Sequence, residues 1–174
     1  MCQVLAGLAI KIRQALTRET TTKLSRSILV LVLALPTAAA AQTPAPYRPG
    51  LGDLMTMTVQ PRHLKLGLAG QEKNWPYATY EGHELEEAFE RVAKQVPKWR
   101  EFDIAPLIAA TVKQPLDDLE AAAKASDGPR FDAAYRQLTD ACNACHKSAN
   151  VGVIAIKVPD GSAFPDQDFR ATKP

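Results

Sequence analysis

The chain has 174 residues, of which 21 are Lys or Arg and 19 are Asp or Glu. The first 41 positions hold five of the basic residues and one of the acidic ones, which leaves 133 residues with 16 basic side chains, 18 acidic ones and a net charge of −2. This balance lacks the basic excess expected of a protein that binds nucleic acid. A length of 133 residues is enough for one domain with a single hydrophobic core.

The first 41 residues have the order of regions found in a secretory signal peptide. Lys23 and Arg26 precede an apolar run over residues 27–35, and an Ala-rich stretch then ends at Ala41. The apolar run is shorter than the stretch of about 20 residues that spans a membrane, so a membrane anchor or a buried helix is the less favoured alternative. We predict a signal peptide over residues 1–41 and an exported protein that does not span the membrane.

The region after the signal peptide begins with a Pro-rich segment over residues 42–50, which is predicted to be a flexible leader. A first helix is predicted from about residue 52 to 69, and Pro61 is expected to kink it or to break it locally. Its apolar residues recur at intervals of three and four, which places them on one helix face. These residues are Leu54, Met57, Pro61, Leu64 and Leu68.

Three further helices are predicted, over about residues 75–96, 103–126 and 129–149. Asn74 is expected to cap the second helix, Pro97 to stop it, and Pro115 to interrupt the third. Helices of this length with short connections favour an all-α domain folded as an antiparallel four-helix bundle over residues 51–149. Residues 150–174 are rich in Pro, Gly and Asp and are predicted to form an irregular C-terminal tail packed on the domain.

Residues 142–146 read Cys-Asn-Ala-Cys-His, the C-x-x-C-H signature of covalent haem attachment. The thiols of Cys142 and Cys145 would form thioethers with the haem vinyl groups, and His146 would give its imidazole to the iron. On a helix these residues stand at i, i+3 and i+4, so they project from one face. We therefore predict one covalently bound haem c as the cofactor and, because such proteins are assembled outside the bacterial inner membrane, a periplasmic location.

An exported helical domain with a single C-x-x-C-H on its last helix resembles the class II c-type cytochromes, the cytochrome c′ type and its low-spin relatives. The resemblance covers roughly residues 50–149, and only Cys142, Cys145 and His146 match the motif of that family. It implies a haem inside the bundle, with a residue of the first helix facing the open side of the iron. Bundles of this kind often pair through their outer helix faces, which leaves a homodimer as an open alternative.

The sixth iron ligand is predicted on the first helix. Met57 lies on the apolar stripe and is the candidate, with Met55 in reserve; the alternative is that Met57 only fills core space. A Met ligand would raise the reduction potential relative to two His ligands. His63 could also bind the iron and give two His ligands, but it lies off the stripe among charged residues, so a solvated surface side chain is the favoured interpretation. His83 is likewise expected on the surface, among its glutamates.

These features lead to the hypothesis of a periplasmic electron carrier that cycles between Fe(II) and Fe(III), with redox proteins as partners. An iron with six ligands has no position for a substrate, so the protein is expected not to be an enzyme. The alternative is a five-coordinate haem protein that binds nitric oxide or carbon monoxide. A remote alternative is a dithiol–disulfide or zinc module at Cys142 and Cys145.

Overall fold

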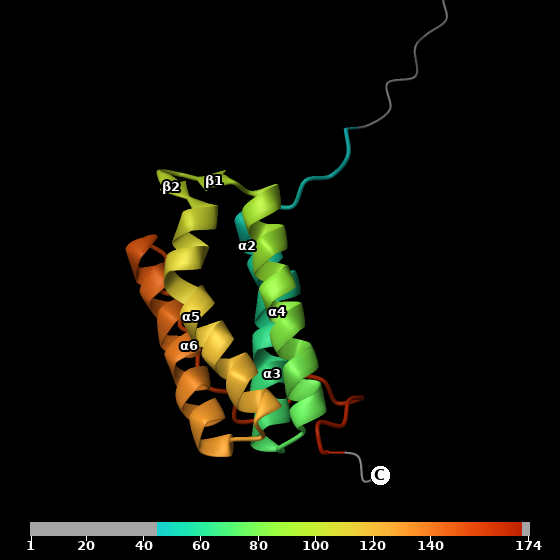
Figure 1. Cartoon of the computed structure of the whole chain (residues 1–174). Coiled ribbons are helices and arrows are strands. Elements are labelled where there is room, and N and C mark those ends of the chain that lie inside the picture. Colours follow the sequence, from blue (N-terminus) through green and yellow to red (C-terminus); the bar gives the residue numbers. More distant parts are fainter. Residues whose placement is uncertain (1–44, 172–174) are drawn as a thin grey trace, which may run out of the picture. The chain divides into compact units, whose positions relative to one another are not determined.

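The structure is a computed structural model that describes residues 45–171 of the chain. The predicted signal peptide over residues 1–41 lies outside the described residues. The described part is mostly helical, which agrees with the predicted all-α class (Figure 1). No helix within it has both the length and the apolar character needed to cross a membrane. The elements in chain order are α2 (Leu51–Leu54), η1 (Met55–Val59), α3 (Gln60–Gln71), α4 (Trp75–Gln95), β1 (Lys98–Trp99), β2 (Phe102–Asp103), α5 (Ile104–Lys124) and α6 (Gly128–Ser148).

The first predicted helix contains a π-helical turn, η1, between α2 and α3. The backbone N–H of Gln60 donates to the carbonyl of Met55, five residues back. Pro61 follows at the start of α3 and has no N–H to offer to the carbonyl four residues earlier. Pro61 therefore interrupts the hydrogen-bond pattern of the helix, and the chain accommodates this interruption by the wider π turn that precedes it. The sequence predicts the kink or local break at Pro61 itself.

The π turn adds one residue to the spacing between inward-facing positions. The buried positions follow the order Leu54, Val59, His63 and Leu66, with an interval of five across η1. The predicted stripe was built on regular helical spacing and placed Met57 inside. That placement is wrong, because Met57 is 60% exposed.

Capping residues fix the ends of α4 and α6. The side chain of Asn74 accepts a hydrogen bond from the N–H of Tyr77, as predicted for the start of α4. Asp127 accepts from the N–H of Arg130 and caps α6 in the same way. The predicted interruption at Pro115 is wrong, because α5 runs through it without a break. Apolar side chains of α5 are buried on both sides of Pro115, and their packing offsets a cost of about 3 kcal/mol for a proline inside a helix.

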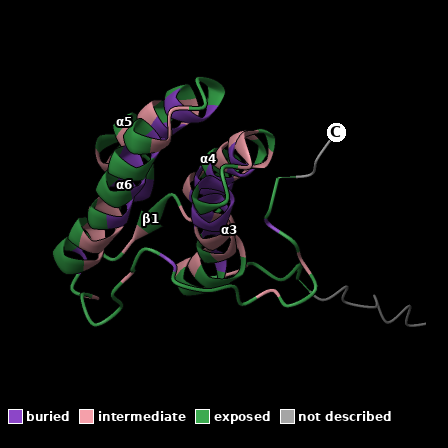
Figure 2. Cartoon of the chain, turned by 90° about the horizontal axis from the view of Figure 1, so that it is seen from below, coloured by how far each residue is buried: buried purple, intermediate pink, exposed green. Residues whose placement is uncertain are grey.

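Consecutive helices pack beside one another: α3 contacts α4, α4 contacts α5, α5 contacts α6, and α3 also contacts α6. Buried residues lie on the faces that the helices turn toward each other (Figure 2). Gly70 allows the close approach of α3 to α6, because a Cβ at this position would collide with the ring of Phe131. The largest fully buried apolar side chains are Leu66, Leu85, Val92, Leu119, Phe131 and Leu138.

Two segments outside the helices lie near the C-terminal end of α6: the connection between α4 and α5, and the tail over residues 151–171. The connection between α4 and α5 forms a short antiparallel hairpin in which Trp99 pairs with Phe102. Residues 151–171 form neither helix nor strand, in agreement with the predicted irregular tail. This tail runs from α6 to the far end of α3, where the side chain of Gln71 donates to the carbonyl of Pro159.

Candidate functional site

An apolar cavity lies at the end of α6, and its lining residues come from α2, η1, α3, α4, the hairpin, α5, α6 and the tail. The volume open to the centres of water molecules is about 220 Å³. A cavity of this kind, mostly apolar with a few polar groups, is the usual setting of a ligand or cofactor site. The lining residues are Leu51, Gly52, Met55, Thr56, Val59, Gln60, His63, Phe89, Trp99, Phe102, Ile104, Leu107, Ile108, Thr111, Val112, Cys142, Cys145, His146, Ala149, Val151, Ile154 and Ile156.

The structure brings the three residues of the C-x-x-C-H motif to this cavity. Cys142, Cys145 and His146 occupy the last two turns of α6, and all three line the cavity. Their spacing of three and four residues accounts for this shared direction, because it matches one face of an α-helix. Both cysteines are free thiols and are partly buried. The haem role of these residues stays a prediction that this geometry accommodates.

The surroundings of the two thiols oppose thiolate chemistry. Burial, together with the nearby Cys145, raises the pKa of Cys142 to about 12, and burial also raises the pKa of Cys145. Dithiols that exchange with disulfides have a lowered thiol pKa instead. Among residues 45–171 no group of three or more His, Cys, Asp or Glu side chains is arranged to hold a metal ion. The raised thiol pKa values therefore do not favour the dithiol alternative.

His146 is held by the tail in a form suited to bind a metal. Its Nδ1 atom lies 2.8 Å from the carbonyl oxygen of Ile154. Because a carbonyl can only accept, Nδ1 carries the proton of this hydrogen bond, which leaves Nε2 as the ring nitrogen that could bind a metal. A neutral imidazole whose second nitrogen donates to a carbonyl is the usual form of a metal-binding histidine.

The two methionines of η1 differ in their position. Met55 is partly buried and lines the cavity, whereas Met57 is largely exposed and is not among the lining residues. The prediction that Met57 faces the interior is wrong because η1 changes the spacing of inward-facing residues. The reserve candidate, Met55, is the thioether that the structure places at the cavity.

The prediction of a solvated His63 is also wrong, because His63 is only 6% exposed and lines the cavity. Its Nε2 lies 3.0 Å from the hydroxyl of Thr139 and its Nδ1 lies 3.0 Å from the hydroxyl of Tyr135. Thr139 donates its own proton to the carbonyl of Tyr135, so it accepts from Nε2–H of His63. The Tyr135 hydroxyl donates to the backbone carbonyl of His63 at 2.7 Å, and the same hydroxyl lies 3.0 Å from Nδ1 of the ring.

Both ring nitrogens of His63 thus lie within hydrogen-bond distance of neutral hydroxyl groups. Burial lowers the pKa of His63 to about 4, so the ring is neutral at pH 7. Sequence reasoning missed this residue because the direction of its side chain depends on the π turn. Pro61 marks a break in the hydrogen-bond pattern, but it does not say whether that break becomes a kink or a π turn.

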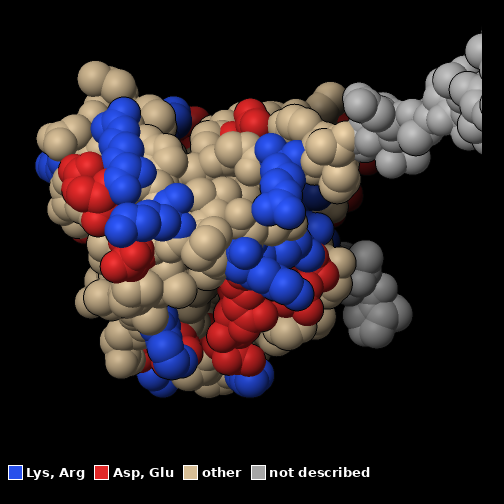
Figure 3. Space-filling view, turned by 90° about the horizontal axis from the view of Figure 1, so that it is seen from above, with Lys and Arg blue, Asp and Glu red and all other residues tan. Residues whose placement is uncertain are grey.

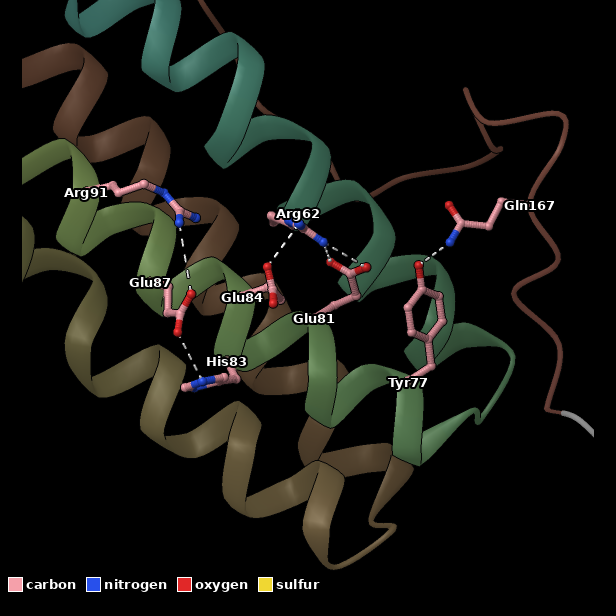
Figure 4. A network of polar contacts seen from close by, with 8 residues as sticks. All are labelled: Arg62, Tyr77, Glu81, His83, Glu84, Glu87, Arg91 and Gln167. Atoms are coloured by element: carbon pink, nitrogen blue, oxygen red, sulfur yellow. Dashed lines mark hydrogen bonds and ion pairs between the residues drawn. The ribbon is translucent and has the colours of Figure 1, made fainter.

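A second polar network joins α3 to α4 away from the cavity (Figure 4). Glu81 is 1% exposed and pairs with Arg62, whose guanidinium also lies 2.9 Å from Glu84. On the outer face, His83 pairs with Glu87 at 3.4 Å, in agreement with the predicted surface position of His83. None of these residues lines the cavity, and their pairing accounts for their charges.

The end of the molecule that holds the hairpin and the end of α6 carries both signs of charge. Lys and Arg side chains are interspersed there with Asp and Glu, and uncharged surface lies between the charged groups (Figure 3). Neither sign of charge dominates this face, so it would not preferentially attract a partner of one charge.

Comparisons of the chain with models of protein families, with curated proteins and with solved structures give no match. A functional assignment therefore depends on the residues of the site and their chemistry.

Proposed function

We propose that the protein is an exported c-type cytochrome that carries one haem, attached to Cys142 and Cys145, and transfers electrons. The observation that carries this proposal is the shared cavity of the C-x-x-C-H side chains. Two thiols and an imidazole on one helix face are the groups that haem c attachment requires, and the surrounding apolar side chains suit a largely apolar macrocycle. A bound haem would supply one-electron chemistry by cycling between Fe(II) and Fe(III).

Each residue of the site has a separate part in this proposal. Cys142 and Cys145 would anchor the haem by thioether bonds, with each thiol adding across one haem vinyl group. His146 would bind the iron through Nε2, because Nδ1 is engaged by Ile154. The apolar lining would exclude water and thereby influence the reduction potential.

Met55 is the sixth ligand that this proposal assigns. It lines the same cavity as His146 and comes from η1, on the first helix. A thioether ligand gives a higher reduction potential than a second imidazole. His63 also lines the cavity, but both of its ring nitrogens already have hydrogen-bond partners, and binding iron would break one of these bonds.

The fold proposed with this function is the antiparallel four-helix bundle of the class II cytochromes. Helices that follow one another in sequence contact one another and are joined by short connections, as in such a bundle. The predicted signal peptide supports a periplasmic location, where redox proteins would be the partners.

A second candidate function is the binding of nitric oxide or carbon monoxide by a five-coordinate haem. The apolar side chains of Leu51 and Val59 line the cavity beside Met55. If one of them faced the iron in place of the Met55 sulfur, the sixth position would be open to a gas.

Optical spectra of the purified exported protein distinguish these functions. Coordination by His146 and Met55 predicts sharp reduced bands, a weak far-red band in the oxidised form that is characteristic of sulfur coordination, and no change with carbon monoxide. A broad high-spin spectrum that shifts with the gas would favour the second function. Absence of haem after export with the maturation machinery present would refute both.

A further inference from the structure

The chain reverses its direction at Asn150, four residues after His146. Asn150 has a positive φ of 57°, and the N–H of Val151 donates to the carbonyl of His146 at 2.9 Å. The N–H of Asn150 donates to the carbonyl of Lys147 at 3.1 Å, which completes the pair of bonds found in a Schellman turn. The tail therefore returns beside the last turns of α6, and the N–H of Ile154 donates to the carbonyl of Val151.

Asn143, one of the two variable residues inside the C-x-x-C-H motif, holds the returning tail. Its Nδ2 donates to the carbonyl of Ile156 at 2.8 Å, and its Oδ1 accepts from the N–H of Ile156 at 2.8 Å. Both backbone groups of one tail residue are thus paired with one side chain. A primary amide suits this pairing because it offers a donor and an acceptor side by side.

The two attachments lie on either side of Ile154. The Schellman turn fixes the chain before it, and Asn143 fixes the chain two residues after it. Between them, the Ile154 carbonyl lies 2.8 Å from Nδ1 of His146. The position of this carbonyl therefore depends on the bonds between Asn143 and Ile156.

We propose that Asn143 is a positioning residue for the iron ligand His146, in an inference that rests on the proposed function. By holding Ile156, it keeps the Ile154 carbonyl on Nδ1–H of His146. This bond orients the imidazole and increases its basicity as a ligand. A more basic ligand stabilises Fe(III) relative to Fe(II), so Asn143 lowers the reduction potential of the haem.

Two variants of Asn143 and one matched control test the proposal in the exported, haem-loaded protein. Asn143→Leu has a similar shape without either polar atom, and Asn143→Asp keeps an acceptor but has no amide donor. The control, Gln71→Ala, removes another bond of 2.8 Å from a side-chain amide to the tail backbone, at Pro159. The readouts are the reduction potential and the solvent exchange of the His146 ring Nδ1–H, followed by NMR.

Asn143→Leu is expected to raise the reduction potential and to increase exchange of the His146 Nδ1–H on the order of tenfold. Asn143→Asp should increase the exchange in the same direction; its potential is not compared, because the added negative charge itself lowers it. Gln71→Ala should leave both readouts at the wild-type values. Wild-type values in Asn143→Leu, or an equal change in Gln71→Ala, would overturn the proposal.

Failure of both Asn143 variants to take up haem, with normal uptake in Gln71→Ala, would also overturn the proposal. The bonds of Asn143 would then serve assembly and not the adjustment of the iron ligand. Absence of haem in the wild type is a distinct result, which refutes the proposed function and not the role of Asn143 alone.

Discussion

The buried His63 should make the stability of the protein depend on pH. Its pKa is lowered from 6.5 to about 4 in the folded protein because burial disfavours the charged imidazole. Between these two values the unfolded chain binds a proton at this position and the folded protein does not. The free energy of unfolding therefore contains a contribution that is complete above pH 6.5 and is lost as the pH falls toward 4.

The size of this contribution follows from the shift in pKa. A difference of one pKa unit corresponds to about 1.4 kcal/mol, so the shift at His63 amounts to about 3 kcal/mol. Solvent screens this contribution little, because the side chain of His63 is almost fully buried. This loss is a large fraction of the 5–15 kcal/mol typical of a folded domain.

Denaturant unfolding at pH 7 and pH 4 measures the effect. His63→Gln replaces the imidazole with a polar side chain that does not titrate, so its free energy of unfolding should fall less with acid than that of the wild type, by about 3 kcal/mol. The control is His83→Gln, because the side chain of His83 is 63% exposed. A pH dependence of His63→Gln equal to that of the wild type would refute the reasoning.

Two further predictions concern η1 and the contact of α3 with α6. Met55→Ala should abolish the far-red band of the oxidised protein, and Met57→Ala should retain it; loss of the band in the second variant alone would reverse the ligand assignment. Gly70→Ala should lower the free energy of unfolding by about 1–3 kcal/mol, because the added Cβ collides with Phe131. In the same denaturant titration Gly82→Ala should raise the free energy of unfolding by about 0.5–1 kcal/mol, because it meets only ordinary contact, and equal effects of the two substitutions would contradict the steric argument.

Features set by local chemistry could be predicted from the sequence. The start of α4 at Asn74 depends on a side chain and backbone only three residues apart. The shared direction of Cys142, Cys145 and His146 depends only on the period of an α-helix. These predictions hold because no distant part of the chain is needed to decide them.

Other features depend on contacts that the sequence pattern does not contain. The directions of Met57 and His63 follow from one π turn, which shifts the inward face by one residue. The continuity of α5 through Pro115 depends on packing against neighbouring helices. The bond from His146 to Ile154 requires the tail to turn back on α6, and residue spacing alone does not predict this path.

The central claim is that one haem is attached to Cys142 and Cys145, and the intact mass of the exported protein under denaturing conditions tests it most directly. We predict the mass of the chain from residue 42 onward plus one haem, and the loss of that added mass when both cysteines are replaced by Ser. The mass of the polypeptide alone, with two thiols that react with an alkylating reagent, would contradict the account.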